Sequence, residues 1–123
     1  MTFNEWKLES YDYSYNAGFW DNFEIKTKPL VGTELNMEAN QNIREEFVIK
    51  LALVITEVSE AIEELRKKDV DSSKFGEELG DIFIRMFDLA YKVEKTYGIS
   101  IEGLMEKKRI GNKSRGHKHG KAF

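Results

Sequence analysis

The sequence of 123 residues contains no cysteine, a single proline and two histidines. The absence of cysteine excludes disulfide bonds, zinc–thiolate sites and a cysteine nucleophile. The sequence also lacks an apolar run long enough to span a membrane, and its first residues do not show the pattern of a signal peptide. From these absences we expect a protein of a reducing compartment, located in the cytoplasm and without a membrane partner.

Charge is distributed unevenly along the chain. The formal net charge is −3, yet residues 107–123 contain seven lysines or arginines and no acidic residue. The other residues include 12 basic and 22 acidic side chains, which would repel a nucleic acid, so we expect no stable nucleic-acid partner. The length predicts one domain, residues 1–123, in which 107–123 form a basic, partly flexible tail. Such a tail either folds onto an acidic site or an anion, or stays solvated.

The pattern of apolar residues predicts an all-α protein. Apolar residues recur at steps of three and four in the two longest segments, as amphipathic helices require. The predicted helices are 3–17, 43–68, 73–97 and 101–110. Asn42 is the expected N-cap of the second helix, Gly98 is expected just past the end of the third, and 111–123 are expected to be extended. We therefore expect a helical hairpin or bundle with an antiparallel central helix pair and extra helices.

The predicted helix 43–68 carries apolar residues on both of its faces. A helix with one apolar stripe covers a single neighbour, whereas a helix that is apolar on two sides is typically buried on both. We therefore expect this helix to be covered from two directions.

Two pairs of acidic residues have the same spacing, Glu57-x-x-Glu60 and Glu78-x-x-Asp81. Residues three apart lie on one face of a helix, and the pairs lie almost equally far from a predicted turn at 66–73. A hairpin would bring the pairs side by side, where four carboxylates suit a hard cation such as Mg²⁺. The alternative is a solvated acidic face. Neither Glu57 nor Glu60 has a cation within one turn of its own helix, which favours the metal site.

Five short motifs, in their order and spacing, resemble those of one known family. They are Gly18-Phe19-Trp20-Asp21, Glu57-Val58-Ser59-Glu60-Ala61, Glu77-Glu78-Leu79-Gly80-Asp81-Ile82, the K-x-x-x-N-x-x-R pattern of Lys108, Asn112 and Arg115, and His119-Gly120-Lys121. These motifs resemble those of the MazG-like all-α nucleoside triphosphate pyrophosphohydrolases. The resemblance covers roughly residues 16–121. One departure is Thr56, which stands where many members have a glutamate that could act as a further ligand or base.

The resemblance implies Mg²⁺-dependent hydrolysis of a (deoxy)nucleoside triphosphate between its α and β phosphates. The products would be a monophosphate and pyrophosphate, and the biological role would be cleaning of the nucleotide pool. Mn²⁺ could substitute for Mg²⁺. The resemblance also implies a homodimer or homotetramer with sites shared between chains.

The resemblance further implies roles for individual residues. Metal binding falls to Glu57, Glu60, Glu78 and Asp81, and catalysis to Glu57 and Glu60. The implied substrate contacts are Lys74, Lys108, Asn112, Arg115 and Trp20. Trp20 or Phe19 could stack on the base, although a core role is an equally open interpretation for either aromatic residue.

Several alternatives remain open from the sequence. The acidic face could belong to a non-catalytic helical interaction module that docks a basic partner or the tail of the chain itself. Phosphoribosyl-ATP pyrophosphohydrolase is a related enzymatic alternative. A ferritin-like di-iron site is disfavoured because it needs Glu-x-x-His pairs, and none of the predicted helices contains a histidine. His117 and His119 could bind a transition metal, but histidines in a flexible tail are usually solvated.

Overall fold

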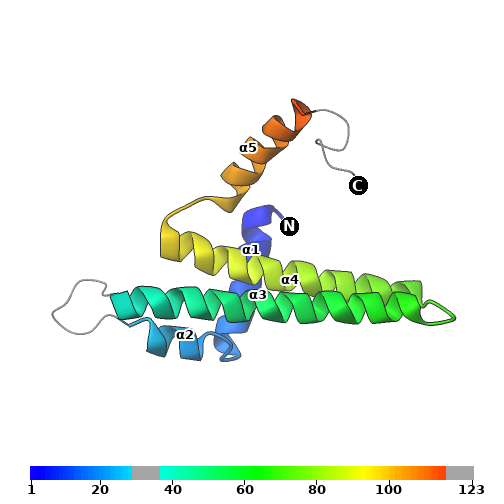
Figure 1. Ribbon diagram of the computed structural model, residues 1–123, viewed down its shortest axis with the longest axis horizontal. Coiled ribbons are helices and arrows are strands. Elements are labelled where there is room, and N and C mark those ends of the chain that lie inside the picture. Colours follow the sequence, from blue (N-terminus) through cyan, green and yellow to red (C-terminus); the bar gives the residue numbers. More distant parts are fainter. Residues whose placement is uncertain (29–36, 116–123) are drawn as a thin grey trace. The chain divides into compact units, whose positions relative to one another are not determined.

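The structure, a computed structural model, describes residues 1–28 and 37–115 and contains five α-helices and no strand in these ranges. The helices are α1 (Phe3–Asn16), α2 (Asp21–Lys26), α3 (Met37–Arg66), α4 (Ser72–Tyr97) and α5 (Ile101–Lys113) (Figure 1). The predicted all-α class is confirmed. The chain divides into two compact units, Met1–Tyr91 and Lys92–Phe123, which are described in turn. Among the described residues, no helix is long and apolar enough to cross a membrane.

The first unit is built on the helical hairpin that the sequence predicts. Helices α3 and α4 run side by side in opposite directions (Figure 1), and an ion pair between Glu57 and Arg85 joins them. Asp71 begins α4, because its side-chain Oδ1 accepts a hydrogen bond from the backbone N–H of Lys74 at 3.1 Å. An acidic N-cap of this kind satisfies one of the unpaired N–H groups in the first turn. The hairpin therefore fixes which residues of α3 face which residues of α4.

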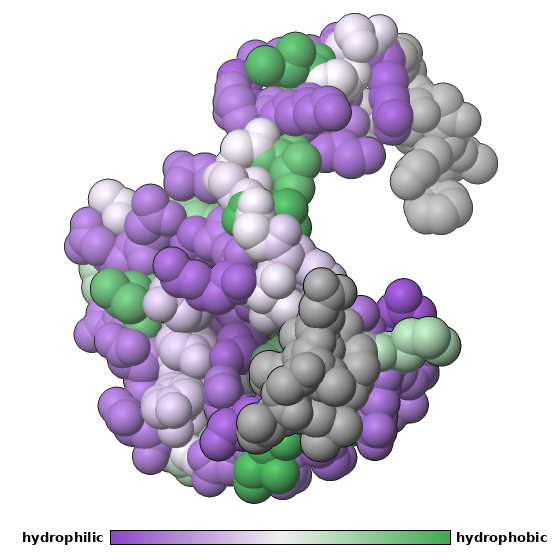
Figure 2. Space-filling view, turned by 90° about the vertical axis from the view of Figure 1, so that its left-hand side faces the viewer, coloured by the Kyte–Doolittle hydropathy of each residue, from purple (hydrophilic) through white to green (hydrophobic). Residues whose placement is uncertain are grey.

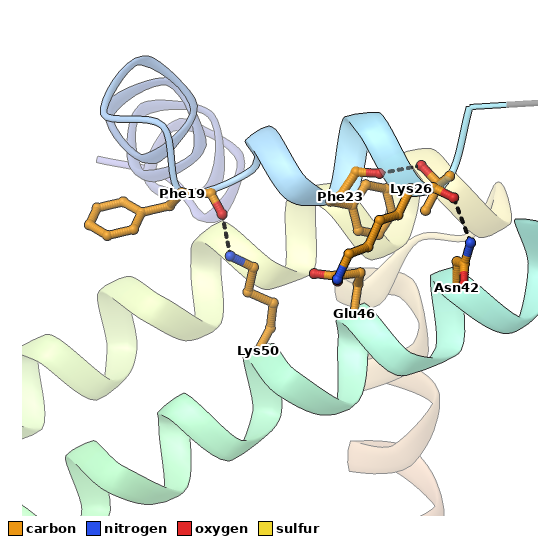
Figure 3. Close-up of polar contacts among 7 residues, drawn as sticks. Phe19, Phe23, Lys26, Asn42, Glu46 and Lys50 are labelled. Atoms are coloured by element: carbon orange, nitrogen blue, oxygen red, sulfur yellow. Dashed lines mark hydrogen bonds and ion pairs between the residues drawn. The ribbon is translucent and has the colours of Figure 1, made fainter.

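Helix α3 begins earlier than predicted. It starts at Met37, so Asn42 lies inside the helix and the prediction of an N-cap at Asn42 was wrong. The side chain of Asn42 instead donates a hydrogen bond to the backbone carbonyl of Lys26, at 2.8 Å (Figure 3). The extra turn is stabilised by tertiary packing, since Ala39 and Ile43 are both buried. Contacts with a distant segment thus override the local capping signal.

Helix α2 was not predicted, because glycine and proline flank its short sequence. Phe23 is buried on α2, and its ring lies 5.3 Å from the ring of Phe47 on α3. Lys26 forms an ion pair with the buried Glu46 of α3 at 3.0 Å, as Figure 3 shows. A helix of six residues is not stable alone in water, so α2 depends on these contacts with α3.

The turn between α1 and α2 places Trp20 in the core. Gly18 has φ +87°, a left-handed conformation that glycine adopts without strain, and this residue ends α1. Trp20 is 0% exposed, and its ring packs edge-on against Phe23 with centroids 5.4 Å apart. Its indole Nε1 donates a hydrogen bond to Asp88 Oδ1 at 2.8 Å. The turn is thereby fastened to α4.

Helix α1 packs through aromatic side chains along α4. Trp6 stacks on Phe87 with centroids 6.0 Å apart, and Tyr11 stacks on Tyr91 at 4.3 Å. The helix begins at Thr2, whose Oγ1 accepts a hydrogen bond from the backbone N–H of Glu5. Aromatic pairs of this kind contribute about 0.5–1.5 kcal/mol each beyond the area they bury. The N-terminal aromatic residues therefore hold α1 against the hairpin.

One face of the hairpin carries a long apolar stripe that stays exposed in the single chain. Its members are 39–65% exposed, namely Ile55, Val58, Ile62 and Leu65 of α3 and Leu79, Phe83 and Met86 of α4. The expected coverage of α3 from two directions is met where α2 and α4 pack on it, but not along these exposed residues within one chain. Elsewhere, on the face shown in Figure 2, hydrophilic side chains predominate and apolar ones are scattered. Exposed apolar residues that recur at helical spacing on two neighbouring helices are typical of an interaction surface.

The second unit contains the end of α4 and helix α5. Gly98, at φ +66°, follows the end of α4 as predicted. Ser100 is the N-cap of α5, and its Oγ accepts a hydrogen bond from the backbone N–H of Gly103 at 3.1 Å. The expected extended segment was wrong for residues 111–113, which continue α5 as far as Lys113. A single glycine lowers helix stability by about 1 kcal/mol, which did not suffice to end this helix. His117, His119 and the predicted tail from 116 onward lie outside the described residues.

The buried position of Trp20 leads to a stability prediction. Replacing Trp20 with alanine should lower the free energy of unfolding by about 3–5 kcal/mol, because it leaves a large cavity. Trp20→Phe should cost about 1–3 kcal/mol, since it leaves the carboxylate of Asp88 without its indole donor. The matched control is Phe19→Ala, at a neighbouring side chain that is 54% exposed; it should change stability by no more than about 0.5 kcal/mol. Urea unfolding followed by fluorescence or circular dichroism measures all three, and equal effects at Trp20 and Phe19 would contradict the assignment.

Candidate functional site

The hairpin brings three of the four predicted acidic ligands together. Glu57 and Glu60 of α3 and Glu78 of α4 each offer a carboxylate oxygen, and these oxygens all lie within 4.8 Å of one another. Two oxygens on opposite sides of one Mg²⁺ lie about 4.2 Å apart, given bonds of about 2.1 Å. Small side-chain rotations would therefore let the three carboxylates share one cation. All three are hard oxygen donors, so the donor set fits Mg²⁺ or Mn²⁺.

Asp81, the fourth predicted ligand, lies next to this cluster rather than in it. It is one turn beyond Glu78 on α4 and lines a pocket of about 270 Å³ together with Glu57. The other lining residues come from α1, the turn after it and α4; they are Ser10, Tyr13, Ser14, Phe19, Ile84, Arg85 and Asp88. The acidic cluster thus opens into a pocket large enough to hold part of a ligand.

Like charges raise the pKa of Glu60. The main cause is the negative charge of Glu57, followed by partial desolvation and by the charge of Glu78. Neighbouring carboxylates disfavour each other's ionised form because their repulsion is relieved by binding a proton. A divalent cation between them would relieve the same repulsion.

Glu57 has a cationic partner that local sequence did not reveal. Its Oε1 accepts a hydrogen bond from Arg85 Nε at 2.7 Å, and the Glu57 side chain is only 12% exposed. Arg85 lies on α4, so an argument from cations on the same helix could not find it. The sequence argument for a metal site relied on Glu57 having no cationic partner. Glu57 has none on its own helix, but it has one in the folded hairpin. One arginine still leaves the cluster with net negative charge.

Thr56, which stands where many similar enzymes have a glutamate, is exposed on α3. Its Oγ1 donates a hydrogen bond to the backbone carbonyl of Ala52, one turn earlier, at 3.2 Å. A hydroxyl that bonds back to its own helix is a common conformation of threonine inside helices. Thr56 is thus occupied with the backbone and adds no carboxylate to the cluster.

The aromatic residues of the first turn take different positions. Trp20 is fully buried, and the Nζ of Lys50 lies 4.5 Å from the centre of its ring. This burial favours the core role that the sequence left open for Trp20. Phe19 is half exposed and lines the pocket, and its backbone carbonyl accepts a hydrogen bond from Lys50 Nζ (Figure 3). Lys50 therefore fixes the backbone at the point where the Phe19 ring leaves the core.

The predicted phosphate-binding residues lie in both units. Lys74 is exposed in the first turn of α4, one turn before Glu78. Lys108 and Asn112 lie four residues apart on α5 and line a shallow hollow with Met105, Arg109 and Lys113. Arg115 follows α5, and its backbone N–H donates a hydrogen bond to the carbonyl of Asn112 at 3.2 Å. Lys108 and Asn112 thus share one face of α5, and their contact with substrate stays a prediction.

The structure adds two residues that the sequence analysis did not select, Arg85 and Asp88. Both lie on α4 on the face of Asp81, at steps of four and three residues, and both line the pocket. This spacing is visible in the sequence and could have indicated a continuous polar stripe from Asp81 to Asp88. Burial raises the pKa of Asp88, while hydrogen bonds from Trp20 and Ser14 act in the opposite direction.

Comparison with known proteins agrees with this geometry. A family model described as the MazG nucleotide pyrophosphohydrolase domain matches residues 49–118. The match covers more than half of the chain, including both acidic pairs and the positions of Lys108, Asn112 and Arg115. The chain therefore belongs to the MazG nucleotide pyrophosphohydrolase family. No curated protein and no solved structure matches the chain.

The raised pKa of Glu60 leads to a prediction for the metal-free protein. The pKa of this carboxyl is higher in the folded protein than in the unfolded chain, so above the ordinary value of 4.5 the folded state holds more protons than the unfolded state. Raising the pH through this range therefore lowers the free energy of unfolding. Below that value both states are protonated and the effect vanishes. Glu60→Gln should therefore be more stable than the unchanged protein at neutral pH, and the difference should shrink toward about pH 4.

The measurement is urea unfolding in the presence of a chelator across this pH range. Glu63→Gln is the matched control on the same helix, because Glu63 is exposed and pairs with Arg66 at 2.7 Å. Removing that surface pair should lower stability by no more than about 1 kcal/mol at neutral pH. If Glu60→Gln followed the same pH profile as Glu63→Gln, the repulsion at Glu60 would be refuted.

Proposed function

We propose that this chain hydrolyses a (deoxy)nucleoside triphosphate between its α and β phosphates, using Mg²⁺, and releases a monophosphate and pyrophosphate. Membership of the MazG family implies nucleotide pyrophosphohydrolase activity. The observation that supports metal dependence is the group of carboxylate oxygens from Glu57, Glu60 and Glu78 within 4.8 Å of one another. An acidic face that only docked a basic partner would not need three carboxylates at one point. Nucleotide-pool cleaning is the role that we infer for such a reaction.

The acidic cluster is the proposed catalytic centre. Glu57, Glu60 and Glu78 would hold the cation, with Asp81 completing the set from the edge of the pocket. When bound, Mg²⁺ would neutralise the phosphates and lower the pKa of a bound water. Arg85 holds the Glu57 carboxylate in place through the 2.7 Å hydrogen bond. An oxygen of Glu60 that is not bound to metal would lie close enough to a metal-bound water to accept its proton.

Basic residues are proposed to contact the phosphates. Lys74 lies one turn from Glu78 at the start of α4, and Lys108 and Asn112 share a face of α5. The planar guanidinium of Arg115 would bind two phosphate oxygens at once, which an ammonium group cannot do. These positive charges complement the acidic cluster, since the cation and the basic side chains together would balance the charge of a bound triphosphate.

A homodimer or homotetramer is proposed from the exposed apolar stripe of α3 and α4. Phe83 is 62% exposed and Ile55 65% exposed, and the stripe follows both helices of the hairpin. Packing two such stripes together removes apolar surface from water at about 25 cal/mol per Å². The second copy would also supply the two-sided burial that the sequence of α3 indicates.

Turnover and metal dependence can be tested together. A panel of nucleoside triphosphates, with phosphoribosyl-ATP included, should yield monophosphate and pyrophosphate in the presence of Mg²⁺. Glu60→Gln should lower kcat by at least about 100-fold, the scale of a lost general base, while Glu63→Gln should keep full activity. Mg²⁺ should raise the Tm of the unchanged protein by ligand linkage and have a smaller effect on Glu60→Gln.

Release of orthophosphate in place of pyrophosphate, or full activity of Glu60→Gln, would contradict the proposed reaction. The same assay tests the basic residues. A chain that ends at Ile110 lacks Asn112 and Arg115 and should have a higher KM or no activity. If the shortened chain matched the full chain, these residues would not contact the substrate.

The proposed assembly predicts a mass of at least two chains in solution. Sedimentation equilibrium or light scattering measures this mass directly. Phe83→Asp would place a charge in the middle of the stripe and should shift the equilibrium toward monomer by at least about tenfold, since burying an unpaired charge is costly. A matched control is Ile110→Asp, at an exposed apolar residue of α5 outside the stripe. A monomeric unchanged protein would contradict the proposal.

A further inference from the structure

The pocket beside the acidic cluster contains residues from a part of the chain that the family match does not cover. The match begins at residue 49, whereas Ser10, Tyr13 and Ser14 lie on α1 and Phe19 follows it. All four line the pocket together with Glu57 and Asp81. The α1 wall of the pocket therefore lies outside the matched domain, and a property that varies within a family, such as the choice of substrate, can reside there.

The pocket extends from the acidic cluster along one face of α4. Asp81, Arg85 and Asp88 line it in that order, at steps of four and three residues. Seven residues of helix correspond to about 10 Å along the axis, at a rise of 1.5 Å per residue. This is the scale of a nucleoside. A nucleotide whose phosphates lie at Glu57 and Asp81 would therefore extend its base toward Asp88.

Aromatic side chains flank this path. Tyr13 is 72% exposed and Phe19 is 54% exposed, and both line the pocket. Lys50 holds the backbone carbonyl of Phe19, so the Phe19 ring projects away from α3, as Figure 3 shows. Exposed aromatic rings stack on nucleobases of any kind because every base has a π-face. These rings provide affinity, whereas discrimination between bases needs a polar group.

Asp88 is that polar group. Trp20 Nε1 donates a hydrogen bond to its Oδ1 at 2.8 Å, and the Ser14 side chain also donates to the carboxylate. A carboxylate can accept about four hydrogen bonds, so these two donors leave capacity for others, and Asp88 lines the pocket. Burial raises the pKa of Asp88, while the two donors and the charges of Lys50 and Arg85 act in the opposite direction.

We propose that this pocket binds the base of the nucleotide and that Asp88 selects cytosine and adenine by their exocyclic amino groups, N4 and N6. The inference rests on the proposed function. A carboxylate accepts hydrogen bonds from the amino groups of cytosine (N4) and adenine (N6). Thymine and uracil present the O4 carbonyl, and guanine the O6 carbonyl, at the equivalent position, and a carboxylate repels these oxygens. Asp88 therefore favours cytosine and adenine and disfavours thymine, uracil and guanine.

The test compares kcat/KM for dCTP and dATP with kcat/KM for dTTP, dUTP and dGTP. Asp88→Asn keeps the shape of the side chain but can donate to the O4 or O6 carbonyl. The ratio of the first group of substrates to the second should fall by about tenfold or more, in line with the discrimination of a good base contact. Trp20→Phe is the control: it removes the indole donor but keeps the carboxylate, so activity can fall while the ratio stays.

Binding of the same five nucleotides, measured by calorimetry with Ca²⁺ in place of Mg²⁺, separates this proposal from the proposed function. Binding with the expected base ratio but without cleavage would support the pocket and refute the reaction. An unchanged ratio in Asp88→Asn, or no binding of any nucleotide, would overturn the role of Asp88. If Asp88→Asn does not fold, Phe19→Ala takes its place, because that exposed residue should weaken binding of all five nucleotides while keeping the ratio. Unaltered affinity in Phe19→Ala would overturn the pocket as the base site.

Discussion

The antiparallel packing of α3 against α4 is the constraint on which the rest of the structure depends. Each helix alone presents acidic residues one turn apart, and the packing turns these into a single group of carboxylates from both helices. The packing holds these like charges close together, and their Coulomb repulsion raises the pKa of Glu60. One contact that opposes this repulsion is the ion pair that Arg85 of α4 forms with Glu57 of α3. In the function that we propose, a bound cation would convert this repulsion into attraction.

A second set of contacts ties the N-terminal segment to the hairpin and thereby creates the pocket. The buried Trp20 bonds to Asp88 on α4, and Lys50 on α3 bonds to the carbonyl of Phe19. Between them these interactions hold the turn after α1 in place, so Tyr13 and Ser14 of α1 line the pocket beside α4. Asp88 thus both accepts a hydrogen bond from the core tryptophan and lines the pocket.

Much of the fold and the main part of the site could be predicted from sequence because their signals are local. The helix period of 3.6 residues places Glu57 with Glu60 and Glu78 with Asp81 without reference to any other residue. Gly98 and Ser100 mark the end of α4 and the start of α5 by their own conformations and side chains. The start of α3 could not be predicted in this way, because Asn42 has a capping side chain that a distant carbonyl, that of Lys26, engages instead.

The sequence by itself therefore determined the helical class, the positions of the long helices and the pairing of the acidic residues within each helix. The tertiary structure decided the partner of Glu57, the burial of Trp20, the existence of α2 and the position of Asp88 in a pocket. The physical reason is the separation along the chain. Arg85 lies 28 residues from Glu57, and Trp20 lies 68 residues from Asp88. Contacts over such separations depend on how whole helices pack, and the local sequence around a residue does not predict them.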